Sequence, residues 1–261
     1  MTAYLGLFPG LCKRVVCVLI AGSVILGTSS ASALTIESTF TTGPEGWKVI
    51  AQNLDGTLVP ESELYATIQH WTWGGPDLGY HGYLAIYDPA PHSTTYWSAP
   101  DKFLGDKASL FGHDLTFHLR QMTIDQPLST IAPEYSNPLD VVLSGGGITI
   151  YRALDEPGLS WTAYSLNLSS SDSWMVLGDG SGDDVEASDA EIMQVLGSLE
   201  KLWIKGEYSF RAGDPKTNPD YPNNDGFMLS YVHVPEPITV CILTMTGSVL
   251  IARRSRMTMP V

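Results

Sequence analysis

The sequence predicts an all-β domain of the sandwich or jelly-roll type, interrupted by one crossover helix. Between residues 34 and 235 the chain is made of short runs rich in aromatic and β-branched residues. Gly, Pro, Asp and Ser punctuate these runs, as the turns of antiparallel sheets require. Only residues 188–199 space their apolar side chains as a helix does. We therefore expect packed sheets and a single helix.

Seven runs have the composition of strands, and one shows the expected alternation clearly. Leu115, Phe117 and Leu119 alternate with polar residues, so one face of this strand should be buried and the other wet. The glycines that follow Ser144 separate two neighbouring runs and predict a hairpin. The seven expected strands are residues 82–87, 114–122, 140–144, 148–152, 161–168, 202–208 and 227–233.

One helix is expected to cross over the sandwich. Ser188, followed three residues later by Glu191, is a capping box that satisfies two backbone N–H groups. Asp189 and Glu191 also suit the positive N-terminal end of a helix. Apolar residues then recur at helical spacing at Ile192, Val195, Leu196 and Leu199. We expect the helix from Asp189 to about Lys201.

The chain opens with the features of a secretory signal peptide. Lys13 and Arg14 precede an apolar run from Val15 to Leu26, and Ala31-Ser32-Ala33 fits a cleavage site of small residues. The run is shorter than the roughly 20 apolar residues of a spanning helix, and an N-terminal anchor is the alternative. We expect a signal peptide at residues 1–33 and export of the rest.

A second apolar segment lies close to the other end. Ile238 to Ala252 carries no charge and is followed at once by Arg253, Arg254 and Arg256. Because basic residues prefer the cytoplasmic side, we expect a transmembrane helix in the inner membrane with the domain outside and the arginines inside. A buried C-terminal helix is the alternative, although it would end in an arginine cluster.

Val234-Pro235-Glu236-Pro237 stands just before this apolar segment, so residues 233–261 contain a proline motif, an apolar helix and arginines in that order. Such a tail resembles the PEP-CTERM sorting signal. The resemblance implies recognition by an exosortase, a membrane protease of bacteria that make exopolysaccharide. The two prolines also hold the motif extended, as a protease requires. The residues expected to act in sorting are Pro235, Glu236, Pro237, Arg253 and Arg254.

The charge of the part between the two ends excludes several partners. Of the 14 Lys and Arg residues and the 28 Asp and Glu residues, residues 34–235 keep nine and 27. So acidic a domain is repelled by the phosphates of nucleic acid and by anionic lipid, and we expect no nucleic acid among its partners. Cys12, Cys17 and Cys241 all lie outside this part, which therefore has no disulfide and no thiolate metal site.

Eight blocks follow one another along the domain: Gly43-Pro44-Glu45-Gly46-Trp47; Gly82-Tyr83-Leu84; Tyr96 to Asp106; Leu115 to Leu119; Asp140 to Leu143; Gly145 to Gly147; Val195 to Leu199; and Leu202 to Tyr208. Together they resemble the laminin B domain, also called laminin IV type A, over nearly all of residues 34–232. The resemblance implies a galactose-binding-like jelly roll of extracellular matrix proteins, without catalytic residues. Cysteine-rich EGF-like modules do not flank the domain, so a laminin network is not implied.

No arrangement of residues typical of an enzyme is found. The sequence has no G-x-S-x-G elbow and no His-Glu-x-x-His helix. The histidines are scattered singly, and His113 and His118 would point to opposite faces of one strand. Paired carboxylates stay open, because only a structure gives their separation. We expect a protein without catalytic activity.

Calcium is the one cofactor considered. Jelly-roll domains of the class that the resemblance implies often hold a structural Ca²⁺ between their first and last strands. Asp225 is the best candidate ligand, with Glu37 as a partner, and a solvated turn is the alternative. The segment from Asp179 begins like an EF-hand loop, but Asp184 stands where Gly is required and Ala190 where Glu is required.

Trp71 and Trp73 are the candidate ligand-binding residues. They stand beside two glycines and close to Tyr80 and Tyr83, as aromatic platforms for sugar rings would on a loop. Trp47, Trp97, Trp161 and Trp203 lie in runs expected to form the core.

The sequence is compatible with three functions. The leading hypothesis is a non-enzymatic cell-surface or matrix protein, sorted by an exosortase and associated with exopolysaccharide. The alternative is a lectin-like module that binds carbohydrate through the two tryptophans. A glycan hydrolase ranks third, because the sequence shows no catalytic constellation.

Overall fold

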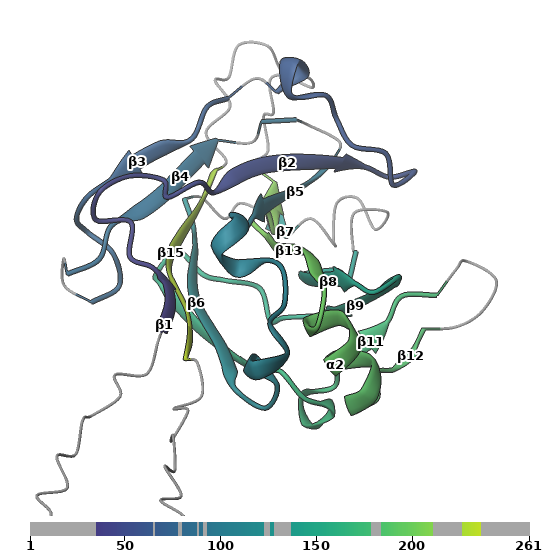
Figure 1. The fold of residues 1–261 in the computed structure, drawn as a ribbon. Helices are drawn as coiled ribbons and strands as arrows, with labels where there is room; N and C mark the ends of the chain where they lie inside the picture. The colour runs from purple at the N-terminus through teal and green to yellow at the C-terminus, as the bar shows by residue number, and fades with distance from the viewer. Residues whose placement is uncertain are drawn as a thin grey trace, which may run out of the picture. The chain divides into compact units, whose positions relative to one another are not determined.

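Two antiparallel sheets packed face to face form the body of the protein, as a computed structural model of the chain shows (Figure 1). The structure describes residues 35–64, 66–77, 80–87, 89–90, 93–122, 126–127, 137–178, 184–210 and 226–235. Within these residues there is one α-helix. The predicted β-sandwich with a single helix is confirmed.

Sheet A is built around its last strand, β15. Its strands, in spatial order, are β10 (Thr162–Asn167), β6 (Asp114–Gln121), β15 (Gly226–Pro235), β4 (Tyr83–Tyr87) and β3 (Gln69–Trp71). β1 (Thr35–Ser38) pairs with the end of β15 that β4 does not reach. β15 therefore has hydrogen-bonded neighbours on both sides (Figure 1).

Sheet B forms the second layer. Its strands, in spatial order, are β12 (Val185–Glu186), β11 (Met175–Val176), β9 (Ile148–Arg152), β8 (Val141–Gly145), β13 (Leu199–Lys205), β5 (Ser93–Ser98) and β2 (Lys48–Asn53). A separate pair joins β14 (Ser209–Phe210) to β7 (Gln126–Pro127). The described residues also form four 3-10 helices: η1 (Glu61–Glu63), η2 (Asp101–Phe103), η3 (Ala108–Leu110) and η5 (Ser170–Asp172).

The main hydrophobic core lies between the sheets. Along β6 burial alternates as predicted, with Leu115, Phe117 and Leu119 buried and the residues between them partly exposed. Successive side chains along a strand point to opposite faces of the sheet. In sheet B, the residues next to those that face the core therefore point to the outer face. Four of these, Tyr96, Val142, Tyr151 and Trp203, form a smaller cluster on the outer face of sheet B.

The predicted hairpin and helix follow their expected chemistry. β8 and β9 are joined by Gly146 and Gly147, both with positive φ, as a type I′ turn requires. α2 (Asp189–Leu196) begins at the predicted capping box, in which Ser188 and Glu191 each accept the other's backbone N–H. The helix stops at Leu196, earlier than predicted, because Leu199 already pairs with Gly145 as the start of β13.

The segments expected at the two ends of the chain lie outside the described residues, apart from His233 to Pro235, which end β15. The signal peptide and the transmembrane sorting helix therefore stay predictions. Among the residues described, no helix has the length and hydropathy needed to cross a membrane.

Candidate ligand-binding site

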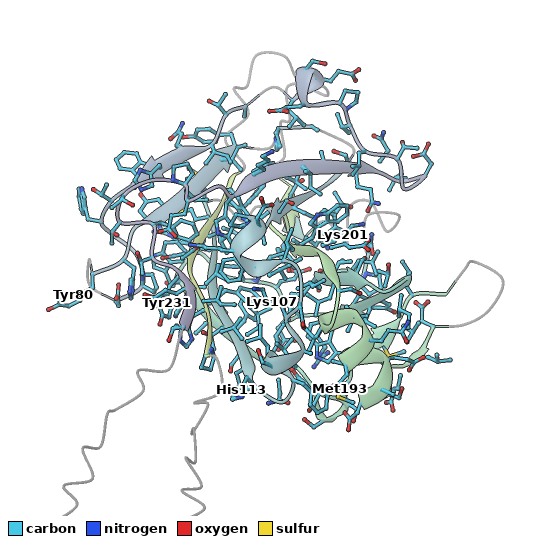
Figure 2. The ribbon with its side chains drawn as sticks, in the orientation of Figure 1. Tyr80, Lys107, His113, Met193, Lys201 and Tyr231 are labelled. Carbon is cyan, nitrogen blue, oxygen red and sulfur yellow. The ribbon has the colours of Figure 1, made fainter. Side chains whose placement is uncertain are left out.

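The exposed aromatic residues of the described part of the domain lie in one hairpin. Trp71 ends β3, while Trp73 and Tyr80 lie in the connection to β4, of which residues 72–77 and 80–82 are described and are called the aromatic loop. Their exposed fractions are 45%, 68% and 80%, and no other described Trp, Tyr or Phe is classed as exposed. Tyr80 points away from the body of the domain (Figure 2). The two predicted ligand-binding tryptophans are thus both exposed, and Tyr80 belongs to the same hairpin.

A row of aromatic rings supports this hairpin. Trp71 stacks on Tyr83, with ring centroids 6.1 Å apart and planes at 12°. Tyr83 in turn meets the edge of Trp161 at 5.6 Å. The Trp161 indole also donates a hydrogen bond to the Gly74 carbonyl, at 3.3 Å. The prediction that Trp161 lies in the core is therefore wrong: it lies beside β10 and holds the aromatic loop.

Strand register places these rings over the outer face of sheet A. Trp71 pairs with Tyr83, Tyr83 with Ser230, Ser230 with His118, and His118 with Ala163. Strands lie about 4.8 Å apart, so this row extends roughly 19 Å across five strands. Segments far apart in the sequence therefore build one surface.

The aromatic loop lies directly against this face. The Ser230 hydroxyl donates to the Gly82 carbonyl at 2.6 Å, and the Gly75 N–H donates to the His81 carbonyl at 3.1 Å. A Cβ at Gly75 would lie 2.7 Å from the His81 carbonyl oxygen and 2.9 Å from the Ser230 hydroxyl. Glycine at position 75 is what lets the loop approach the sheet so closely.

Three histidines that are distant in the sequence meet at one tyrosine beneath the loop. The ring of His81 stacks on Tyr231 at 4.3 Å, His233 stacks on it at 5.6 Å, and His118 lies 6.3 Å away. His81 Nδ1 also pairs with Asp77 at 2.5 Å. These histidines are scattered in the sequence, and no local pattern predicts the cluster, because it depends on how three different segments are aligned in the fold.

A bulge in β15 makes the cluster possible. The register between β15 and β6 shifts between Ser230 and His233, and Tyr231 has a φ of 43°. A bulge leaves one residue unpaired and turns its side chain, and a positive φ is costly for a residue that carries a Cβ. The bulge turns the Tyr231 ring into the space between the histidines.

The surroundings of His118 disfavour its charged form. Its side chain is half-buried, and its Nδ1 has no hydrogen-bond partner. Burial lowers the pKa of His118; the Asp77 carboxylate works against this, and His81 adds to it. Burial, together with Glu37 and Asp77, raises the pKa of the Tyr231 phenol.

The predicted calcium ligands are only partly described. Glu37 is exposed on β1 opposite His233, and its backbone carbonyl accepts a hydrogen bond from Lys102 at 2.6 Å. Asp225 lies outside the described residues. Within the described part, no three His, Cys, Asp or Glu residues are grouped so that they could hold a metal ion. The calcium site stays a prediction.

The predicted sorting residues lie at the edge of the described chain. Pro235 is the last residue of β15 and pairs with Thr35. Glu236, Pro237, Arg253 and Arg254 lie outside the described residues. The described part of β15 therefore reaches the first proline of the Pro-Glu-Pro motif.

Two of the laminin-B-like blocks meet in space and serve the fold. The Glu45 carboxylate accepts the N–H groups of Thr39 and Phe40, at 3.1 and 2.7 Å, and also pairs with the Lys102 ammonium. Trp47 packs against Phe103 at 5.5 Å. These residues join the start of the chain to η2 and are structural rather than ligand-binding.

A hollow of about 360 Å³ lies elsewhere, between β2 and the segment before β3. Its lining is mostly aliphatic: Val49, Ile50, Val59, Leu64, Ala66, Ile68 and Ile86, with Lys48, Glu61 and Thr67. None of these described lining residues carries an aromatic ring on which a sugar could stack.

Residues 96–214 match the family described as Laminin B (Domain IV). Laminin subunit alpha-1 of Mus musculus is 32% identical over 91 residues, which are 33% of this chain and 3% of that protein. The likeness to a laminin domain is thereby confirmed, including the block from Tyr96 to Asp106. The chain spans only a small fraction of this relative.

Solved structures support the fold. The L4b domain of human laminin alpha-2 is 14% identical, with a TM-score of 0.52, and the match covers 79% of this chain and all of that domain. CtCBM11 is 11% identical, with a TM-score of 0.40, over 80% of this chain and 98% of that one. The first likeness establishes the laminin-like sandwich, and the second is too distant to argue from.

Proposed function

We propose that this chain is an exported, non-catalytic surface module that binds extracellular polysaccharide through Trp71, Trp73 and Tyr80. One observation carries the proposal: the exposed Trp and Tyr side chains of the described residues all belong to this one hairpin. Large aromatic surfaces left in water are unfavourable to the free protein and typical of binding sites. Flat rings on a backed hairpin suit the flat faces of sugar rings.

The charge of the domain restricts the ligand to neutral or amino-bearing glycans. Residues 34–235 carry nine bases against 27 acids, so a polyanionic glycan is repelled. Most described bases are also engaged within the protein: Lys102 with Glu45, Arg120 with the Leu159 carbonyl, Arg152 with Asp172, Lys201 over Trp203, and Lys205 with Asp140. Part of their capacity to bind carboxylates or sulfates is therefore already used.

Among the described residues, one hydroxyl lies near a histidine, and its geometry does not support hydrolysis. Thr116 Oγ1 lies 3.5 Å from His233 Nδ1, but the same hydroxyl donates to the His233 carbonyl at 3.3 Å. A nucleophile must give its proton to the base that activates it. Because the Thr116 hydroxyl donates its proton to a backbone carbonyl, it connects two strands and does not act as a nucleophile. This is consistent with a binding module.

Affinity electrophoresis in gels that contain a neutral glucan or galactan, chitosan, or polygalacturonate tests the proposal. The wild type should be retarded by at least one neutral or amino glycan and not by polygalacturonate. Trp71→Ala and Trp73→Ala should each weaken retardation about tenfold, since loss of one aromatic anchor costs about 1–2 kcal/mol. Met193→Ala, at an exposed apolar residue of α2 (Figure 2), is the control. Equal retardation of all variants, or none of the wild type by any glycan, contradicts the proposal.

The cellular part of the proposal is sorting by an exosortase. Its support is the Val-Pro-Glu-Pro motif, the apolar segment and the arginines of residues 233–261. The described sheet ends at Pro235, so the proposed processing motif adjoins the folded domain. Release from the inner membrane would then deliver the aromatic loop to the exopolysaccharide outside the cell.

A further inference from the structure

We propose that protonation of His118 releases the aromatic loop from sheet A, so that the module holds glycan at neutral pH and lets it go in acid. The inference rests on the proposed function, since it concerns regulation of the same binding residues. Two observations support it: the contacts by which His81 attaches the loop to sheet A, and the position of His118 beside Tyr231 beneath the loop.

His81 attaches the loop to the sheet. Its ring stacks on Tyr231, with centroids 4.3 Å apart and planes at 25°. Its backbone N–H donates to Asp77 Oδ1 at 3.1 Å and its carbonyl accepts the Gly75 N–H, so both sides of the loop depend on its position. Trp73 lies in the part of the loop held by these bonds, while Trp71 and Tyr83 anchor the strand ends. Movement of His81 therefore moves the aromatic surface.

His118 lies on β6, beside Tyr231, where an added proton is poorly accommodated. The ionisable groups on the elements around it are Asp77 and His81 of the loop, Tyr83 of β4, Tyr231 and His233 of β15, Glu37 of β1 and Arg120 of its own strand. On the β10 side its partner is Ala163, which carries no charge. The Asp77 carboxylate already pairs with His81. A charged His118 would thus be half-buried, without a carboxylate of its own and close to a second imidazole.

The sign of the effect follows from linkage. Burial lowers the pKa of His118 in the closed position relative to an exposed histidine. Above the pKa of the exposed form, both positions hold neutral His118 and the closed loop keeps its full stability. As the pH falls below it, the open position binds the proton more tightly, and the closed loop loses stability. Unperturbed Asp and Glu side chains titrate at about 4, below this window, whereas an unperturbed histidine titrates at about 6.5.

Hydrogen exchange of the ligand-free protein tests the attachment directly. Between pH 7.5 and pH 5.0, the protection factors of amides in residues 72–77 and 80–82 should fall roughly threefold or more. His118→Gln, which cannot take up the proton, should remove this fall. His113→Gln, at a histidine well apart from Tyr231 (Figure 2), should retain it. Equal protection at both pH values in the wild type, or an unchanged fall in His118→Gln, overturns the inference.

Glycan binding at the same two pH values separates this inference from the function on which it rests. If the wild type binds less tightly at pH 5.0 and His118→Gln binds equally at both, the inference stands. If binding is the same at both pH values, regulation fails while the proposed function stands. If protection falls in acid but no glycan binds at either pH, the loop release is real and the proposed function fails. Far-ultraviolet circular dichroism at pH 5.0 confirms that the variants stay folded.

Discussion

At the scale of single residues, Glu45 shows how one side chain can hold two distant segments together. Its carboxylate accepts two backbone N–H groups and pairs with Lys102. Burial raises the pKa of Glu45, but the Lys102 ammonium and the Phe40 N–H outweigh this and hold the pKa below its ordinary value. The ionised form is thus favoured by folding, and its contribution is present above the ordinary pKa and lost as the pH falls through the lowered one.

Glu45→Ala should lower the free energy of unfolding by about 1–3 kcal/mol at pH 7, because the Phe40 and Thr39 N–H groups lose their acceptor. Urea denaturation measures this. Glu63→Ala, at an exposed glutamate of η1, should change it by less than about 0.5 kcal/mol. The difference between the two variants should shrink towards pH 4, and a difference that is independent of pH would contradict the assignment.

The residues of the candidate site were only partly predictable. The exposure of Trp71 and Trp73 could be predicted because they stand beside two glycines and close to Tyr80 and Tyr83, as rings on a loop do. Trp161 was misplaced, because its run also fits a core strand and only the register shows which face it occupies. The cluster of His81, His118 and His233 around Tyr231 depends on the bulge in β15. No local sequence pattern predicts this bulge.

At the scale of elements, α2 is the part whose chemistry is most local. Its capping box joins Ser188 to Glu191, and Asp189 accepts the Ser170 N–H at 2.8 Å. Because the capping box joins residues only three apart, the start of the helix could be predicted from sequence. The Ser170–Asp189 bond joins residues 19 apart and could not be predicted in this way. The end of the helix could not be predicted, since Leu199 fits the helical spacing but belongs to β13.

Ser188→Ala should lower the free energy of unfolding by about 1 kcal/mol, the usual effect of losing an N-cap side chain. Ser188→Asp should retain most of the stability, because a carboxylate also caps a helix. Thermal or urea unfolding reports both, with Ser109→Ala in η3 as the control. Equal stability of Ser188→Ala and the wild type would show that packing alone defines the helix start.

Strands were predictable where they alternate and not where they are polar or short. The seven expected strands are all present, as β4, β6, β8, β9, β10, β13 and β15. β5 was not expected, because its sequence Ser-Thr-Thr-Tyr-Trp-Ser opens with three hydroxyl residues, yet it is buried between β13 and β2. β1 and β3 have four and three residues, too few for any periodicity to show.

At the scale of the whole molecule, the laminin-like sandwich was predictable because many separate blocks agree on it. The family match begins at residue 96, so the earlier blocks depend on the structure for support, and there Glu45 and Trp47 do pack against η2. The two ends of the chain are a separate matter, since their predicted roles concern the cell rather than the fold.

Replacement of both Pro235 and Pro237 by Ala should block the proposed processing, because the motif loses its fixed extended shape. The intact mass of the protein from the cell surface and from membranes is the measurement. The wild type should begin near Leu34 and end near the motif, and the variant should stay in the membrane with residues 238–261 attached. A Met193→Ala control should be processed normally. Identical masses for the double variant and the wild type would defeat the sorting proposal.

The pairing of Thr35 with Pro235 has a mechanical consequence. Thr35 and Pro235, the first and last described residues, lie side by side, so forces that pull them apart would peel β1 from β15 one hydrogen bond at a time. A load between the C-terminal flank and a glycan held at the β3–β4 hairpin would instead run lengthwise along β15. There the ladders to β4 and β6 share the strain. A module anchored at its C-terminal side and bound to a polysaccharide would therefore meet the force of flow along β15, the direction in which many hydrogen bonds must break at once.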